Sequence, residues 1–322
     1  MKDTYHLCLS SHDEVMFRNE NDLIIGFNYL ALAALETDSI LLADGFLSTH
    51  HHEAARTDNP NELARRHRYS YTRYFNAKYH RKGTLGEKEG FILKVDGLYH
   101  IQSMLNYVLR QGLHHGMAAT AFGYPYGSVN TYFRKDLGRD RTPDLIDEFK
   151  RHNYLPYNIK LPSQYRMAAN GLLLREDIED AAYVESVYVS PRNFLFQMNK
   201  ISDGKDIAEQ QKENGSPVIT LDVIEKGVPE FDPSKAFVAE QGRVNLNRMT
   251  DLELCHIIDD IILPARYFKS GESSIYCLPH SKRADLGNAI WKETRAARYN
   301  KCDSLFSEKI VTEDQIRRCL AL

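Results

Sequence analysis

The sequence lacks any apolar run long enough to cross a lipid bilayer. Stretches such as Ile40–Ala43 and Ile261–Leu263 are only a few residues long, whereas a membrane-spanning helix needs about 20 apolar residues. The first residues, Met1–Thr4, also lack the apolar core of a signal peptide. We therefore expect a cytoplasmic protein that makes no contact with a membrane.

Cysteine is scarce as well. The chain has 5 cysteines, an odd number, and no Cys-x-x-Cys pair. This pattern argues against a disulfide framework and indicates reduced thiols, as in a cytosolic protein. The cysteines are Cys8, Cys255, Cys277, Cys302 and Cys319.

A strong excess of charge of one sign is also absent. The formal net charge is -3 over 322 residues, which gives no overall support for nucleic-acid binding. The distribution differs, because residues 56–82 contain eight Lys or Arg and only two acidic residues. Two interpretations stay open, a solvated helix face or a surface for a phosphate backbone, and the interleaved aromatic residues suit the second. On that interpretation the expected DNA contacts are Arg65, Arg66, Arg68, Arg73, Lys78 and, further along the chain, Arg110.

Hydrophobic periodicity and turn residues predict a regular first part of the chain. The expected strands are residues 4–9, 40–46, 50–56 and 91–95. Three helices are expected, one that ends near residue 35, one at 61–79 and one at 98–111. The first six elements follow the order βαββαβ. We therefore predict an α+β fold, a ferredoxin-like antiparallel sheet with helices on one face.

The signal weakens after Phe133. Helices are predicted at 143–152, 175–183, 250–263, 282–299 and 312–320, and a strand at 218–223. We therefore divide the chain into residues 1–135 and a mostly helical accessory region, residues 136–322. A length of 322 residues is compatible with one large or two ordinary domains.

Two short stretches carry the chemistry. If His50-His51-His52 is a strand, the side chains of His50 and His52 point one way and that of His51 points the other. If Tyr107 and Gln111 lie on a helix, they are one turn apart on one face. Two imidazoles, an amide oxygen and a phenol then meet at one divalent cation. These are the groups needed to cut a phosphodiester with a tyrosine nucleophile.

Five segments in order resemble a known family. They are Tyr5–Leu7, Phe46–His52, Tyr71–Asn76, Ile101–Gln111 and Tyr124–Ser128. Together they make residues 1–135 similar to the one-tyrosine HUH single-strand transposases of bacterial insertion sequences, with the REP-associated tyrosine transposases as the most similar branch.

This resemblance implies an HUH endonuclease domain in which His50, His52 and Gln111 hold Mg²⁺ or Mn²⁺. Tyr107 would be the catalytic nucleophile, giving metal-dependent cleavage and strand transfer through a covalent 5′-phosphotyrosine intermediate. The expected partner is single-stranded or hairpin DNA. A second copy of the chain, in a homodimer, stays open as a further partner.

The sequence departs from the family pattern at two positions. His51 stands where a bulky apolar residue is usual, and Thr49 replaces an asparagine. His51 is compatible with a buried, hydrogen-bonded imidazole, with a shifted strand register, or with lost catalysis. The last case defines an alternative function, a domesticated and catalytically silent DNA-binding or regulatory protein.

A third interpretation is an unrelated metal-dependent hydrolase that uses the histidine cluster. It is disfavoured because no acidic residue has a recognisable zinc-ligand spacing to these histidines. Glu53 would lie on the face of His51, and we expect His114 and His115 to sit in an exposed loop.

Overall fold

Four strands form one antiparallel sheet in the order β2-β3-β1-β4. They are β1 (Asp3–Ser10), β2 (Ile40–Phe46), β3 (His50–Thr57) and β4 (Phe91–Lys94), with α1 (Glu20–Glu36) after β1 and α2 (Pro60–Tyr79) after β3. This is the ferredoxin-like arrangement, so the predicted α+β fold class is confirmed. The computed structural model describes residues 2–87, 90–156, 159–199, 248–267, 274–300, 305–306 and 309–322.

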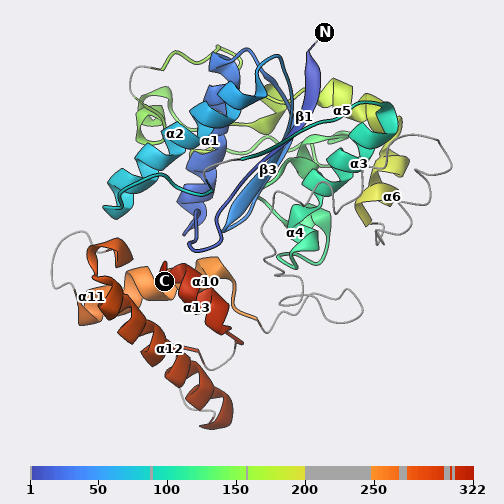
Figure 1. The fold of residues 1–322 in the computed structure, drawn as a ribbon. Coiled ribbons are helices and arrows are strands. Elements are labelled where there is room, and N and C mark those ends of the chain that lie inside the picture. The colour runs from blue at the N-terminus through green and yellow to red at the C-terminus, as the bar shows by residue number, and fades with distance from the viewer. Residues whose placement is uncertain are drawn as a thin grey trace.

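Helices cover both faces of the sheet. On one face α1 and α2 enclose an apolar cluster that includes Leu30, Leu41 and Phe75. On the other face α3 (Leu98–Leu109), α5 (Ala181–Tyr188) and α6 (Pro191–Asn199) enclose a second cluster that includes Leu42 and Val108 (Figure 1). The expectation of helices on one face therefore describes α1 and α2 but not α3, because β2 presents apolar side chains in both directions.

Side-chain caps mark the starts of the main helices. The side chain of Asn19 accepts a hydrogen bond from the backbone N–H of Asp22, and Asn59 accepts one from Glu62 with Pro60 in the first turn. Thr250 and Thr312 each form a capping box with the residue three positions on. Each cap satisfies backbone N–H groups that have no partner inside the helix.

The predicted helix 98–111 is broken at Arg110. It consists of α3, which ends at Leu109, and the short α4 (Gln111–His114). The break coincides with close packing, since a Cβ on Gly112 would lie 2.3 Å from Cβ of Tyr124. A Cβ on Gly45 of β2 would lie 2.8 Å from the carbonyl oxygen of Val108. These two glycines let α3 and α4 approach the sheet.

The described residues of the later part of the chain form helices and short helical turns. The predictions at 250–263, 282–299 and 312–320 are confirmed. The predicted helix at 143–152 is a 3-10 turn over its second half only, and the one at 175–183 is a 3-10 turn followed, after a break, by the start of α5. The strand predicted at 218–223 lies outside the described residues. The elements here are the 3-10 turns η1 (Ala121–Gly123), η2 (Ser128–Thr131), η3 (Glu148–Asn153), η4 (Arg175–Asp177) and η6 (Ile275–Cys277), the π-helical turn η5 (Ile257–Ile262), and the helices α10 (Asp251–His256), α11 (Leu263–Arg266), α12 (His280–Asn300) and α13 (Glu313–Cys319).

Helices α10–α13 have a core of their own and dock on one end of the sheet (Figure 1). The buried guanidinium of Arg18 donates to both carboxylate oxygens of Asp259, at 2.8 and 2.9 Å. Ser48, just before β3, donates to Asp251 of α10 at 2.8 Å. Among the described residues, no helix combines the length and the hydropathy of a membrane span. The division at residues 135 and 136 stays a prediction.

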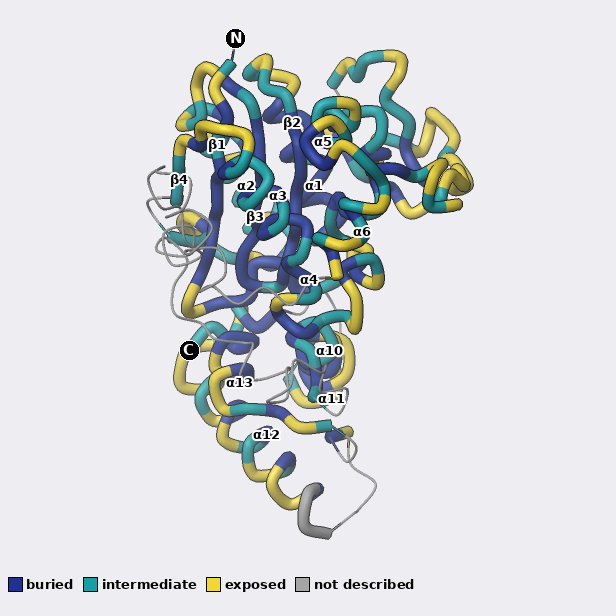
Figure 2. Tube along the Cα trace, turned by 90° about the vertical axis from the view of Figure 1, so that its right-hand side faces the viewer, coloured by how far each residue is buried: buried dark blue, intermediate teal, exposed yellow. Residues whose placement is uncertain are grey.

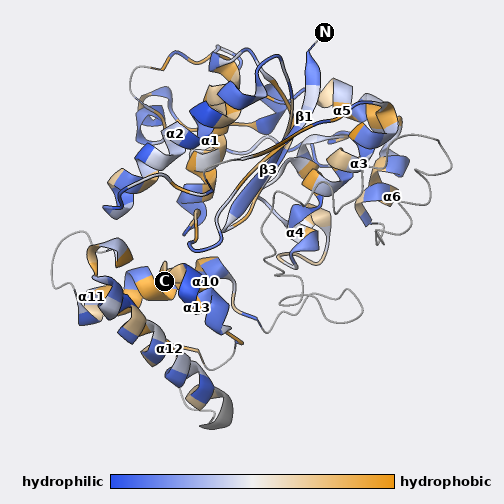
Figure 3. Cartoon of the chain, viewed as in Figure 1, coloured by the Kyte–Doolittle hydropathy of each residue, from blue (hydrophilic) through white to orange (hydrophobic). Residues whose placement is uncertain are grey.

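Strand β3 is polar and yet buried. Figure 3 colours much of it as hydrophilic, whereas Figure 2 draws the same strand as buried. Four consecutive titratable side chains, those of His50, His51, His52 and Glu53, are at most 3% exposed. Burial of polar groups is unfavourable unless they find partners. The partners of these four residues therefore define the candidate sites.

Candidate functional site

Alternation along β3 sends its four polar side chains to opposite faces of the sheet. Residues His50 and His52 lie on the face covered by α3, where His52 packs against Tyr107 of that helix. Residues His51 and Glu53 lie on the other face, beside His67 of α2. The register pairs His52 with Cys8 of β1 and Gly45 of β2.

On the α3 face, His52 lies between a histidine and a tyrosine. Its Nδ1 atom is 3.0 Å from Nε2 of His6, and the two rings are stacked with centroids 5.1 Å apart. The ring of Tyr107 meets His52 edge to face at 5.0 Å and His6 at 5.8 Å. The structure thus brings the predicted nucleophile Tyr107 against one of the predicted ligands.

His50 has two neighbours of its own. Its Nδ1 atom is 3.0 Å from the hydroxyl of Thr49, and its ring centroid is 4.8 Å from that of His115. If the Thr49 hydroxyl accepts the Nδ1–H of His50, the lone pair of His50 lies on Nε2. With the hydrogen bond in that direction, Thr49, the second departure from the family pattern, would hold the imidazole in a tautomer that can bind a metal.

Gln111 belongs to the same group, although it lies on α4 and not on the helix of Tyr107. Its Nε2 donates to the backbone oxygen of Tyr107 at 3.1 Å. The side-chain amide is thereby oriented, and its Oε1 atom stays available as an acceptor. Burial lowers the pKa of His50 to about 3, although the neighbouring Gln111 side chain acts to raise that pKa.

Three buried polar atoms here meet no hydrogen-bond partner: Nε2 of His50, Nε2 of His52 and Oε1 of Gln111. Burial also lowers the pKa of His52 well below its ordinary value, so both imidazoles are neutral near pH 7. Neutral imidazole and amide oxygen are the forms in which these groups bind cations. The donor set therefore fits a divalent cation such as Mg²⁺ or Mn²⁺.

Sequence reasoning missed two histidines of this group. His115, expected in an exposed loop, is 7% exposed and lies against His50, while His114 is exposed as expected. His6 is fully buried beside His52. The alternation in β1 hints at the face that His6 occupies, but the pairing of β1 with β3 is needed to bring it to His52.

The six predicted DNA contacts do not gather at this site. Arg65, Arg66, Arg68, Arg73 and Lys78 lie on α2, which covers the opposite face of the sheet. Arg65 and Arg66 pair with Glu62, and Lys78 pairs with the buried Asp22 at 2.6 Å. Arg110, between α3 and α4, is the one member on the side of Tyr107.

No family model matches the chain, and no curated protein matches it. Among solved structures, the chain is similar to one described as a REP-associated tyrosine transposase bound to a REP hairpin. That similarity has a TM-score of 0.36 and 11% sequence identity, and it covers 51% of this chain and 95% of the other. A similarity of this size establishes neither a shared family nor a shared activity.

Proposed function

We propose that this chain binds single-stranded or hairpin DNA and cleaves it with Tyr107 as the nucleophile. One observation carries the proposal: Tyr107 packs against His52, beside three buried metal-ligand atoms that have no hydrogen-bond partner among the described residues. The ordered motifs of residues 1–135 give the same reaction class independently of this geometry.

In this reaction the phenol oxygen of Tyr107 loses its proton and forms a bond to a DNA phosphorus. The bond from phosphorus to the 3′ oxygen breaks, and that oxygen leaves as a hydroxyl. The downstream fragment stays attached to Tyr107 through its 5′ phosphate, and reversal of the step with a new 3′ hydroxyl gives strand transfer. His50, His52 and Gln111 would hold a divalent cation, which supplies charge stabilisation at the scissile phosphate when bound.

The test is incubation of labelled hairpin DNA with the protein and Mn²⁺, followed by denaturing electrophoresis. We expect a covalent adduct with the wild-type protein and none with Tyr107→Phe. Tyr99→Phe is the matched control, since it removes a hydroxyl from the same helix about 12 Å away and should leave the adduct unchanged. An adduct that persists in Tyr107→Phe would refute the assignment of the nucleophile.

A second candidate function is DNA binding without chemistry. It is favoured by burial, because Tyr107 is 7% exposed and His52 is 0% exposed, so DNA reaches the phenol only if the surrounding chain moves. A native gel shift run beside the denaturing gel then shows DNA retention by the wild-type protein and by Tyr107→Phe alike, and the denaturing gel shows no adduct with either.

A further inference from the structure

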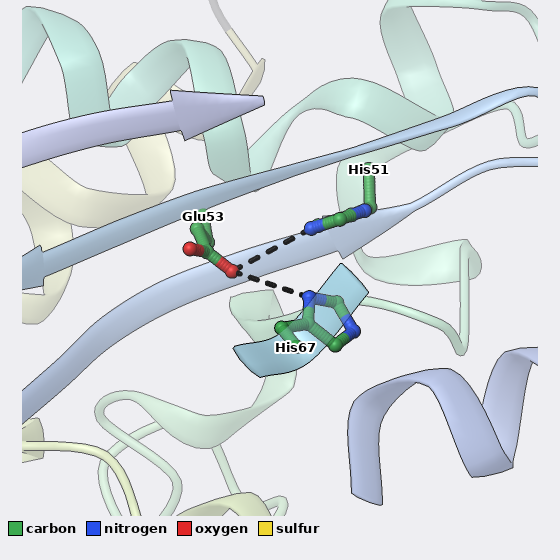
Figure 4. Close-up of side chains that lie close together, drawn as sticks. All are labelled: His51, Glu53 and His67. Carbon is green, nitrogen blue, oxygen red and sulfur yellow. Dashed lines mark ion pairs between the residues drawn. The ribbon is translucent and has the colours of Figure 1, made fainter. Parts of the chain in front are cut away.

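A second group of potential metal ligands lies on the opposite face of the sheet from Tyr107. His51 and Glu53 project from β3, and His67 projects toward them from α2 (Figure 4). One nitrogen of each histidine and one oxygen of Glu53 all lie within 4.8 Å of one another. Nε2 of His51 is 3.5 Å from Oε2 of Glu53, and Nδ1 of His67 is 3.9 Å from the same oxygen.

The hydrogen bonds around this group leave lone pairs directed at its centre. Nε2 of His67 is 3.0 Å from the carbonyl oxygen of Gly26, which can only accept, so the ring proton sits on Nε2. Nδ1 of His67 therefore presents a lone pair to Oε2 of Glu53, which has no hydrogen-bond partner. Two acceptors facing one another are unfavourable unless a cation or a proton lies between them.

Three arginines, Arg65, Arg68 and Arg73, line the same pocket as this group. Glu53 is 1% exposed, and within the described ranges no Lys or Arg forms an ion pair with it. Burial raises the pKa of Glu53 to about 7, while His67 acts to lower it and Asp44 acts to raise it further. Phe46 stacks on His51 with ring centroids 4.9 Å apart, which fixes the orientation of the imidazole.

We propose that Glu53, His51 and His67 bind a zinc ion through Oε2, Nε2 and Nδ1 respectively. Zinc takes two histidines and one glutamate in tetrahedral sites that keep a fourth position open, with bonds of about 2.0–2.2 Å. Neighbouring ligands of such a tetrahedron are about 3.4 Å apart. The observed separations of 3.5 and 3.9 Å are close to that value and need only small side-chain shifts.

The three side chains also border a pocket, although each is almost fully buried. The pocket has a volume of about 920 Å³ and lies between α2 and the β1–β4 side of the sheet. The pocket is also bounded by Leu9 and Ile92 of these strands. A water molecule in the pocket can complete the coordination, so the site resembles an open zinc site more than a closed structural one. His50, His52 and Tyr107 do not line this pocket.

The experiment separates this site from the one on the α3 face. His50→Ala/His52→Ala removes the ligands beside Tyr107, and a second protein carries Glu53→Gln in addition. Both are stripped with EDTA, equilibrated with zinc, dialysed, and analysed for metal by mass spectrometry. We expect about one zinc per chain in the first protein and at least a tenfold lower content in the second. Equal zinc content in the two would overturn the proposal.

A measurement on the unaltered chain keeps the test decisive if the variants fail to fold. Crystals of the wild-type protein are soaked in zinc, and anomalous differences are collected on both sides of the zinc absorption edge. The proposal requires a peak within bonding distance of His51, Glu53 and His67. A map with zinc elsewhere and no peak between these three side chains would refute it.

Discussion

His6 and His52 lie on neighbouring strands with Nε2 of the first 3.0 Å from Nδ1 of the second. Only one of these nitrogens carries the shared proton. If Nδ1 of His52 donates, the lone pair of His52 lies on Nε2, which is the buried atom without a partner. In that arrangement His6 would act as a positioning residue, because it would select the tautomer of His52 that can bind a cation.

Replacing His6 by phenylalanine should weaken Mn²⁺ binding about 10- to 100-fold, the usual loss when the partner of a metal-binding histidine is removed. The ring volume is kept, while the acceptor for His52 is lost. Isothermal titration with Mn²⁺ measures the effect, with the exposed His12→Ala as the control. An unchanged dissociation constant for His6→Phe would show that His52 does not depend on this hydrogen bond.

Arg175→Met should destabilise the fold by about 3–5 kcal/mol, because it leaves a buried carboxylate without its counter-charge. Nε and Nη2 of Arg175 donate to the two oxygens of Asp44 at 2.7 and 2.8 Å, and both residues are buried. Burial acts to raise the pKa of Asp44, but the Arg175 guanidinium outweighs it and the pKa is lowered. Urea unfolding gives the free energy.

Two comparison variants accompany Arg175→Met. Arg65→Met removes an arginine that is 63% exposed and should change stability by less than about 0.5 kcal/mol. Asp44→Asn/Arg175→Met removes both charges and should recover part of the loss. A loss below about 1 kcal/mol for Arg175→Met alone would mean that water or a rearranged neighbour compensates Asp44.

The metal-free protein should lose stability as the pH falls from 6.5 toward 5. Burial lowers the pKa of His6, His50, His51 and His67 to about 3, so these imidazoles take up protons in the unfolded chain before they do so in the folded one. Protonation of the unfolded chain then favours unfolding. Glu53 acts in the opposite direction, since its pKa is raised to about 7 and it binds a proton in the folded state first.

The pKa is lowered in the same direction for His52 and His115, which makes six histidines, and it is raised for Glu179 as well as Glu53. Six histidines against two glutamates leave a net uptake of about four protons on unfolding toward pH 5. Denaturant titrations at several pH values with EDTA present measure the slope. His67→Leu should reduce it, because one buried imidazole is removed. A stability that is constant or rises on acidification would show that these histidines reach solvent in the folded protein.

Local sequence signals account for much of the first 135 residues. The alternation of a strand places His50 and His52 on one face, and the caps at Asn19 and Asn59 are read directly from residue type. Each of these inferences depends on chemistry within a few residues of chain, which a sequence displays without knowledge of the fold.

The rest depends on contacts between distant segments. The break at Arg110 accompanies the packing of Tyr124 on Gly112, and the burial of His115 depends on its contact with His50. The group of His51, Glu53 and His67 arises because α2 packs on the sheet with His67 beside these two residues of β3. No local pattern encodes that packing, so the zinc-type ligand set is invisible in the spacing of its members.

Because β3 carries titratable side chains on both faces, its register with β1 and β2 decides which of them face α3 and which face α2. Consecutive positions of the strand serve opposite faces, so inserting or deleting one residue between Ser48 and His50 would exchange the two sets of side chains. Glu53 would then face Tyr107, and His52 would face α2. The short turn, closed by the hydrogen bond from the Leu47 N–H to the His50 carbonyl oxygen, keeps each set on its own side.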